Sequence, residues 1–149
     1  MAPPTRSPTH EDVPPATLAK LGLDLDEAAE AAGGPITHET LVELATDRGK
    51  PVSQYYAAAV LATDVEIARE HELTLVFCAG TCQRWGALDC LDRAAERKEA
   101  GAPIDLGVRA CLDRCDHAAV CEIRTPHGTT VVTEATPAKI DTAIDTLLH

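Results

Sequence analysis

The spacing of apolar residues changes at Leu73, and this change constrains the fold more than any other feature of the chain. Upstream, apolar residues recur at the spacing typical of amphipathic helices. Residues 73–78 then read LTLVFC, a short apolar run that indicates a buried strand. Further on, β-rich segments at 120–124 and 129–132 are separated by Thr-Pro-His-Gly, which predicts a hairpin. A helical first half and a sheet-containing second half are therefore expected.

Three helices are expected in the first half. They run from Pro15 to Gly33, from Thr37 to Gly49, and from Ser53 to Ala68. Gly33-Gly34 favours a left-handed cap at the end of the first helix, and Gly49 and Pro51 end the second. Thr37 and Ser53 are the expected N-caps of the second and third helices. This half carries no motif for chemistry, so we expect it to brace the rest of the chain or to dock on a partner.

The second half has the element order β-α-β-β-β-α. The strand at 73–78 is followed by a helix over 84–100, a short strand near 107–110, the hairpin, and a last helix that opens at Thr136-Pro137. This order predicts the α/β class, with a thioredoxin-like domain preceded by an all-helical N-terminal extension. The expected segments are a mobile tail at 1–14, a helical segment at 15–71, and the thioredoxin-like domain at 72–149.

The charge of the chain argues against some classes of partner. Its 13 basic and 24 acidic residues give a net charge of −11, which argues against nucleic acid. No run approaches the roughly 18 apolar residues of a membrane span, and the first residues lack the apolar stretch of a secretory signal. We therefore expect a cytoplasmic protein without direct membrane insertion. In that compartment cysteines are reduced and more often hold metal or carry out redox chemistry.

Two pairs of cysteines share one spacing, with three residues between the members of each pair. Cys78 and Cys82 follow the predicted strand, and Cys111 and Cys115 lie in a second loop. Four thiolates from two loops make an all-cysteine site, and soft sulfur selects zinc or an iron–sulfur cluster. Zinc knuckles usually have two intervening residues, so the wider spacing favours two irons bridged by sulfide. A structural zinc-binding interaction module stays an alternative, because some zinc sites accept about four intervening residues.

The other two cysteines are expected to be packing residues. Cys90 falls inside a predicted helix beside Leu88 and Leu91, and Cys121 falls inside a predicted strand. Such positions suit cysteine as a small buried apolar side chain. A thiol oxidoreductase that uses Cys78 and Cys82 is a third alternative, although its dithiol would normally have two intervening residues.

No catalytic residues are predicted. His117 is expected in an exposed loop, and His38, His71 and His127 in polar surroundings without a ligand-like partner. The chain has no glycine-rich phosphate loop and no nucleophile–His–Asp arrangement. We therefore expect no bond-making chemistry from the chain alone.

The cysteine segments carry a family resemblance. Cys78-Ala-Gly-Thr-Cys82 is followed by Gln-Arg-Trp-Gly-Ala, Cys111-Leu-Asp-Arg-Cys115 is followed by Asp116, and Thr136-Pro137 opens the last helix. In these features the chain resembles the thioredoxin-like 2Fe–2S ferredoxin family. The likeness is greatest to the small peripheral 2Fe–2S subunit of respiratory complex I and of NAD-linked hydrogenases and formate dehydrogenases.

The resemblance implies an electron-transport role. It implies a 2Fe–2S cluster held by Cys78, Cys82, Cys111 and Cys115, in a non-catalytic one-electron carrier subunit of an NAD(P)H-, hydrogen- or formate-linked oxidoreductase complex. It also implies a larger flavin- and iron–sulfur-bearing subunit as partner, which residues 16–70 are expected to contact.

The chain departs from the family pattern at two places. The family's first pair usually has four intervening residues, so Cys90 is a conceivable substitute ligand. The family's Thr-Phe-Tyr stretch, which faces the flavin-bearing subunit, reads Val60-Leu61-Ala62 here. A stand-alone thioredoxin-like ferredoxin therefore stays open as an alternative.

Overall fold

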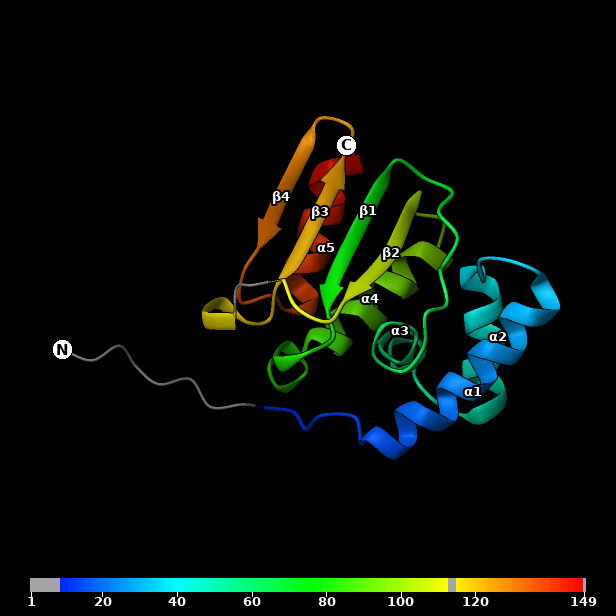
Figure 1. Cartoon of the computed structure of the whole chain (residues 1–149). Coiled ribbons are helices and arrows are strands. Elements are labelled where there is room, and N and C mark those ends of the chain that lie inside the picture. The colour runs from blue at the N-terminus through cyan, green and yellow to red at the C-terminus, as the bar shows by residue number, and fades with distance from the viewer. Residues whose placement is uncertain (1–8, 113–114, 149) are drawn as a thin grey trace.

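The chain alternates helices and strands in its second half and is helical in its first. The structure, a computed structural model, describes residues 9–112 and 115–148, with Cys115 described in its backbone alone. The predicted α/β class and the order β-α-β-β-β-α are confirmed. The elements in Figure 1 are α1 (Pro15–Ala32), α2 (His38–Arg48), α3 (Val52–Leu61), β1 (Leu73–Cys78), η1 (Thr81–Trp85), α4 (Ala87–Glu99), β2 (Ile104–Arg109), η2 (Cys115–His117), β3 (Cys121–Thr125), β4 (Gly128–Val132) and α5 (Pro137–Leu148).

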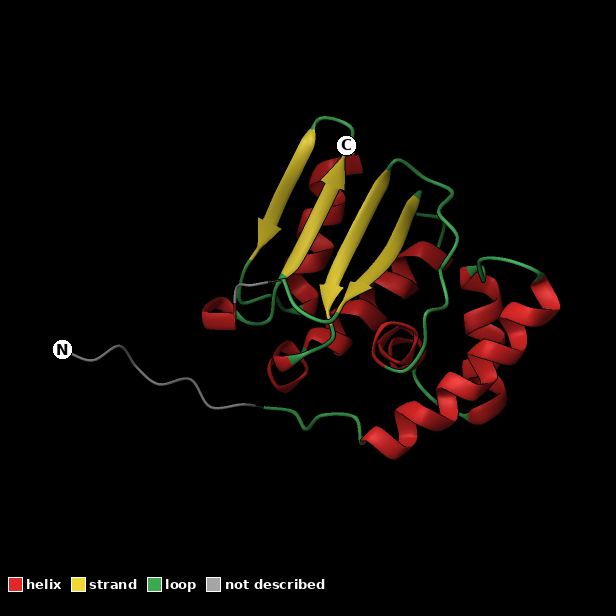
Figure 2. Ribbon diagram, in the orientation of Figure 1, coloured by secondary structure: helices red, strands yellow, loops and turns green. Residues whose placement is uncertain are grey.

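A mixed sheet of four strands forms the centre of the second half. Its order is β2-β1-β3-β4, with β1 parallel to β2 and antiparallel to β3. Helices α4 and α5 lie behind one face of this sheet (Figure 2). Leu75 and Phe77 of β1 have exposed fractions of at most 1%. The same holds for Leu91 of α4 and Ile140 of α5. Each such side chain contributes about 1.5–3 kcal/mol by leaving water, so this layer is the main apolar core.

The first-half helices lie beside the β2 edge of the sheet (Figure 1). Helix α3 contacts both β2 and α4, and α1 packs along α3. The predicted Thr37 and Gly33 caps are confirmed: the Thr37 hydroxyl accepts the N–H of Thr40 at 3.2 Å, and Gly33 closes α1 at positive φ. Gly49 closes α2 in the same conformation. One contiguous cluster of buried apolar residues includes members of α1, α3, β1 and α4.

The third helix is shorter than predicted and starts differently. Ser53 does not cap it, because its hydroxyl and its N–H both donate to the carboxylate of Asp92 on α4, at 2.8 and 3.0 Å. The helix ends at Leu61 because tertiary contacts hold the following chain in extended form. Ile36 and Ile67 form a parallel bridge, and the N–H of Ile36 donates to the Glu66 carbonyl at 2.9 Å.

The residues ahead of α1 run along the loop after β1. The N–H groups of Thr9 and His10 donate to the Arg84 carbonyl at 3.0 and 3.1 Å, and the N–H of Val13 donates to Gln83 Oε1 at 2.8 Å.

Residues 1–8 of the predicted mobile tail lie outside the described residues. The division of the chain at residues 14 and 71 stays a prediction. Across residues 9–112 and 115–148, no helix combines the length and apolarity needed to cross a membrane.

Candidate metal centre

The two cysteine loops start side by side at one edge of the sheet. Cys78 is the last residue of β1 and pairs in register with Arg109, the last residue of β2. The pairing continues one step further, because the N–H of Ala79 donates to the Arg109 carbonyl at 2.8 Å. Parallel strands present their carboxyl ends at the same edge, where open α/β sheets commonly carry their sites. The sequence predicts that the first pair follows the strand; Cys78 is instead its last residue, and Cys82 follows in η1.

Gly80 lets the backbones of the two loops touch. A Cβ atom placed on Gly80 would lie 2.2 Å from the carbonyl oxygen of Ala110, and 3.8 Å from the sulfur of Cys78. The first distance is far below any van der Waals contact with an oxygen that the backbone holds in place. Glycine is therefore needed here for space.

The sulfur of Cys78 accepts hydrogen bonds from both loops. The N–H groups of Gly80 and Cys82 donate from the first loop, the N–H of Leu112 donates from the second, and the Cys82 thiol donates as well. The bond from Cys82 contributes most to lowering the pKa of Cys78 to about 6, against the opposite effect of burial. The thiolate of Cys78 is therefore favoured relative to an ordinary cysteine although its exposed fraction is 1%. When protonated, its thiol can donate to the Ala110 carbonyl at 3.7 Å.

The structure brings together some of the predicted ligands. Cys82 lies in η1, is 2% exposed and contacts the Cys78 sulfur. Cys111 is exposed and directly precedes Leu112, and the side chain of Cys115 lies outside the described residues. Within the described part of the chain, no three His, Cys, Asp or Glu side chains are grouped closely enough to hold a metal ion. The four-cysteine site therefore stays a prediction.

Cys90 and Cys121 are buried, as packing residues should be. Both have an exposed fraction of 0%. Burial raises the pKa of Cys90 to about 12, and it also raises the pKa of Cys121, to which the charge of Cys90 adds. Both thiols stay protonated at neutral pH, so neither is prepared to bind metal in the way that Cys78 is.

His38 differs from its predicted polar surroundings. It is buried, its Nδ1 lies 2.6 Å from the Tyr56 hydroxyl, and its Nε2 lies 3.5 Å from Glu99. The sequence holds a signal for this, since His38 shares its helical spacing with Leu41 and Ala45 on the buried face of α2. His117 is exposed, as predicted.

Comparison with known proteins adds no identification. No protein-family model matches the chain, and a search of curated proteins finds no match. The contacts of the two cysteine loops are therefore the main support for a function.

Proposed function

We propose that the chain is a one-electron carrier subunit that holds a 2Fe–2S cluster through Cys78, Cys82, Cys111 and Cys115. The observation that carries this proposal is the convergence of N–H groups from both cysteine loops on the buried sulfur of Cys78. The second half would be a thioredoxin-like domain, and its β-α-β-β-β-α order with a mixed sheet supports that fold. A cytoplasmic location, where cysteines are kept reduced, is part of the proposal.

The donor chemistry of the site suits an iron–sulfur cluster. Clusters are held by thiolates, and their potentials depend on hydrogen bonds to sulfur and on exposure to solvent. The pKa of Cys78 is lowered, so removing its proton before it binds iron costs less free energy than for an ordinary cysteine. The N–H groups of Gly80 and Leu112 stabilise negative charge on that sulfur, and burial keeps water away from it. When bound, the cluster would supply reversible uptake of a single electron.

One observation favours a second candidate, a thiol oxidoreductase. The lowered pKa of Cys78 and its hydrogen bond to Cys82 are features of a reactive dithiol. Exposure argues the other way, because the two sulfurs belong to residues that are only 1% and 2% exposed. Exchange with a protein disulfide requires the attacking sulfur to reach its target, so the electron-carrier function is favoured.

Oxygen-free purification with analysis of iron, acid-labile sulfide and zinc tests the proposal. We expect about two irons and two sulfides per chain, and a red-brown colour from visible absorption. Stoichiometric zinc without iron would replace this function by that of a structural zinc module. Turnover in a disulfide-reductase assay without bound iron would instead support the thiol oxidoreductase.

A carrier without a substrate of its own must dock, and two large apolar side chains of the helical segment are exposed. Leu23 of α1 is 69% exposed and Leu61 of α3 is 40% exposed. The two helices are close there, because a Cβ on Gly22 would lie 3.2 Å from the Cβ of Ala62. We propose that a larger flavin- and iron–sulfur-bearing oxidoreductase subunit covers this surface. A stand-alone ferredoxin would instead meet its partners briefly.

A further inference from the structure

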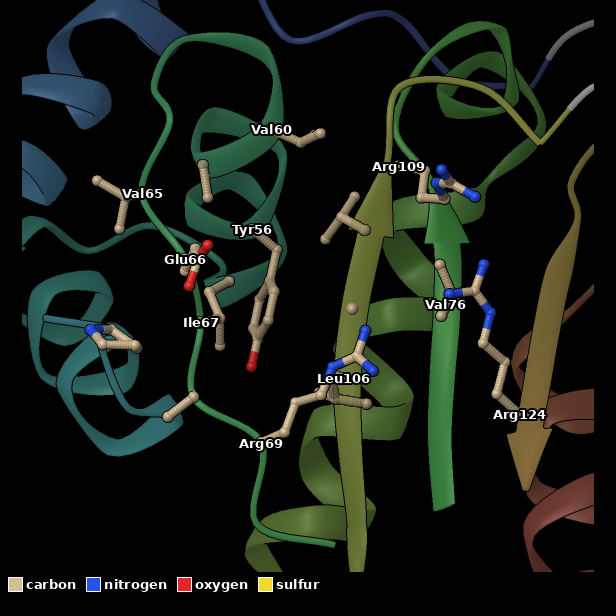
Figure 3. A pocket seen from close by; sticks show the side chains of 15 residues that line it. Tyr56, Val60, Val65, Glu66, Ile67, Arg69, Val76, Leu106, Arg109 and Arg124 are labelled. Carbon is tan, nitrogen blue, oxygen red and sulfur yellow. The ribbon is translucent and has the colours of Figure 1, made fainter. Parts of the chain in front are cut away.

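A cavity of about 620 Å³ lies between α3, the segment after it and the outer face of the sheet. Figure 3 shows this cavity, hereafter the arginine groove, with the ring of Tyr56 on one wall and Leu106 and Val76 on the sheet side. Its remaining walls are largely aliphatic, including Val60, Val65 and Ile67. A volume of this size, with aliphatic side chains and several charged groups in its lining, is compatible with a small-molecule site.

The charged groups of the arginine groove have an unusual distribution. In the described part of the chain, the arginines that form ion pairs with carboxylates are Arg48, Arg84, Arg93, Arg97 and Arg124, and of these Arg124 lines the groove. Among residues 9–112 and 115–148, Arg69 and Arg109 are the arginines without such a pair, and both line the groove. Both side chains are exposed, so they can meet a ligand from solvent, in a chain whose 24 acidic residues outnumber its 13 basic ones.

The two unpaired arginines lie at different heights along β2. Arg109 ends the strand, and Arg69 reaches from the neighbouring segment toward Leu106 (Figure 3). Leu106 lies three positions before Arg109 in the strand, which corresponds to about 10 Å. Arg124, which pairs with Glu122 at 2.8 Å, flanks the sheet side, and Glu66 lies on the opposite wall. Positive charge therefore dominates the sheet side of the groove.

The geometry points to a binding site for a small organic anion. We propose that an apolar body lies over Val76 and Gly107 while acidic groups, carboxylate or phosphate, pair with Arg69 and Arg109. A guanidinium suits both groups because its planar fork donates two hydrogen bonds at once. This site does not depend on the proposed cluster.

Net charge favours a compact ligand over an acidic protein segment. Charges interact appreciably within about 8–10 Å at ordinary ionic strength, so a small anion inside the groove experiences mainly the local arginines. A larger acidic partner would also meet the surrounding surface of a chain whose net charge is −11, and it would be repelled.

Gly107 provides a substitution that fills the groove without disturbing the fold. It pairs with Val76 in the sheet, and a Cβ there would meet Val76 Cγ2 at 3.5 Å and Thr74 Cγ2 at 3.7 Å, which are ordinary contacts. Gly107→Leu therefore adds side-chain volume on the Val76 face, which lines the groove. Gly107→Ala is the milder variant if the leucine variant fails to fold.

The test measures binding of biphenyl dicarboxylate, a rigid apolar body with a carboxylate at each end, by titration calorimetry on the full chain. We expect one-to-one binding that weakens about tenfold in Arg69→Gln and in Arg109→Gln, since each loses a charge-assisted pair. Gly107→Leu should abolish binding, Gly107→Ala should weaken it, and about 1 M salt should weaken it in the wild type. Arg84→Gln is the matched control, because Arg84 pairs with Asp12 outside the groove, and it should bind like the wild type.

Several results would overturn the proposal. They are the absence of saturable binding, equal affinity in Gly107→Leu and wild type, or an equal loss in Arg84→Gln. Equal binding of the uncharged dimethyl ester would show that the arginines do not contribute to binding. Tighter binding of polyglutamate than of the dicarboxylate would assign the groove to an acidic protein segment instead. Unfolding curves for every variant establish that a loss of binding is not a loss of fold.

Discussion

The backbone N–H of Leu112 donates a hydrogen bond to the sulfur of Cys78, although the two residues belong to different loops. This bond depends on the parallel pairing of β1 with β2, which ends at Cys78 and Arg109. It gives one thiolate donors from both loops before any metal binds. The N–H donors around the Cys78 sulfur therefore come together because β1 pairs with β2, and neither loop supplies all of them.

Replacing Cys78 by serine should remove the proposed cluster. The hydroxyl stays protonated at neutral pH and is a poor ligand for iron, so bound iron should fall sharply and the visible spectrum should be lost or shifted. Iron and sulfide analysis after oxygen-free purification measures this. The same result is expected for serine at Cys82, Cys111 and Cys115.

The fully buried cysteines provide the matched control. Cys90→Ala and Cys121→Ala should each lower the free energy of unfolding by about 1 kcal/mol, because a small buried apolar group is lost, and should leave bound iron unchanged. Urea unfolding and iron analysis check both statements. If Cys90→Ala abolishes the cluster while Cys82→Ala retains it, the ligand of the first pair is Cys90.

Gly80→Ala should disrupt the contact between the cysteine loops. The added Cβ would lie 2.2 Å from the Ala110 carbonyl oxygen, so one backbone must move, at a cost of about 1–3 kcal/mol. Because that movement displaces the donors around Cys78, we expect reduced iron content as well as reduced stability.

Gly34→Ala is the control for this substitution. Its Cβ would meet no atom within 4 Å and its φ is not positive, so stability and iron content should stay at the wild-type level. Wild-type iron content in Gly80→Ala would show that the loop contact is not needed for the site.

Local patterns predict the elements of this chain well, and long-range contacts explain what they miss. The strand at Leu73–Cys78 and the Thr37 cap are confirmed because each depends on residues close in sequence. The end of α3 is missed because Ile36, far away in the chain, pairs with Ile67 and holds the segment after Leu61 extended.

The site shows the same division. The sequence indicates that both cysteine pairs lie in loops, but not that Gly80 must admit the Ala110 carbonyl. The arginine groove could not be predicted at all, because Arg69 and Arg109 meet there only once α3 and its following segment lie beside β2.

His38 should make stability depend on pH. Burial is the main reason that the pKa of His38 is lowered in the folded chain, the charge of Lys98 acts in the same direction, and Glu99 and Glu39 oppose it. The unfolded histidine titrates near about 6.5. Below that pH the unfolded state binds the proton first, so stability is fully present above about 6.5 and is lost as the pH falls through the folded pKa.

The measurement is the free energy of unfolding by urea between about pH 7 and pH 5, in wild type and in His38→Gln. Cys78, whose pKa is lowered to about 6, adds a slope of the same sign in both proteins, so the difference between them reports His38. We expect the wild type to lose more stability on acidification than the variant. Parallel curves would mean that His38 has no shifted pKa.

Leu23→Glu and Leu61→Glu should weaken docking without unfolding the chain. Both side chains are substantially exposed, at 69% and 40%, so a carboxylate there remains hydrated in the free protein but would be buried against an apolar partner surface. Leu147→Glu is the matched control, because Leu147 is also 40% exposed but lies on α5.

The experiment is co-purification of tagged chains from the native host at physiological salt, with mass spectrometry of the proteins recovered. We expect a larger flavin- and iron–sulfur-bearing subunit with wild type and Leu147→Glu, and its loss with the other two variants. Recovery of every protein as a free monomer that still reduces and reoxidises would identify a stand-alone ferredoxin.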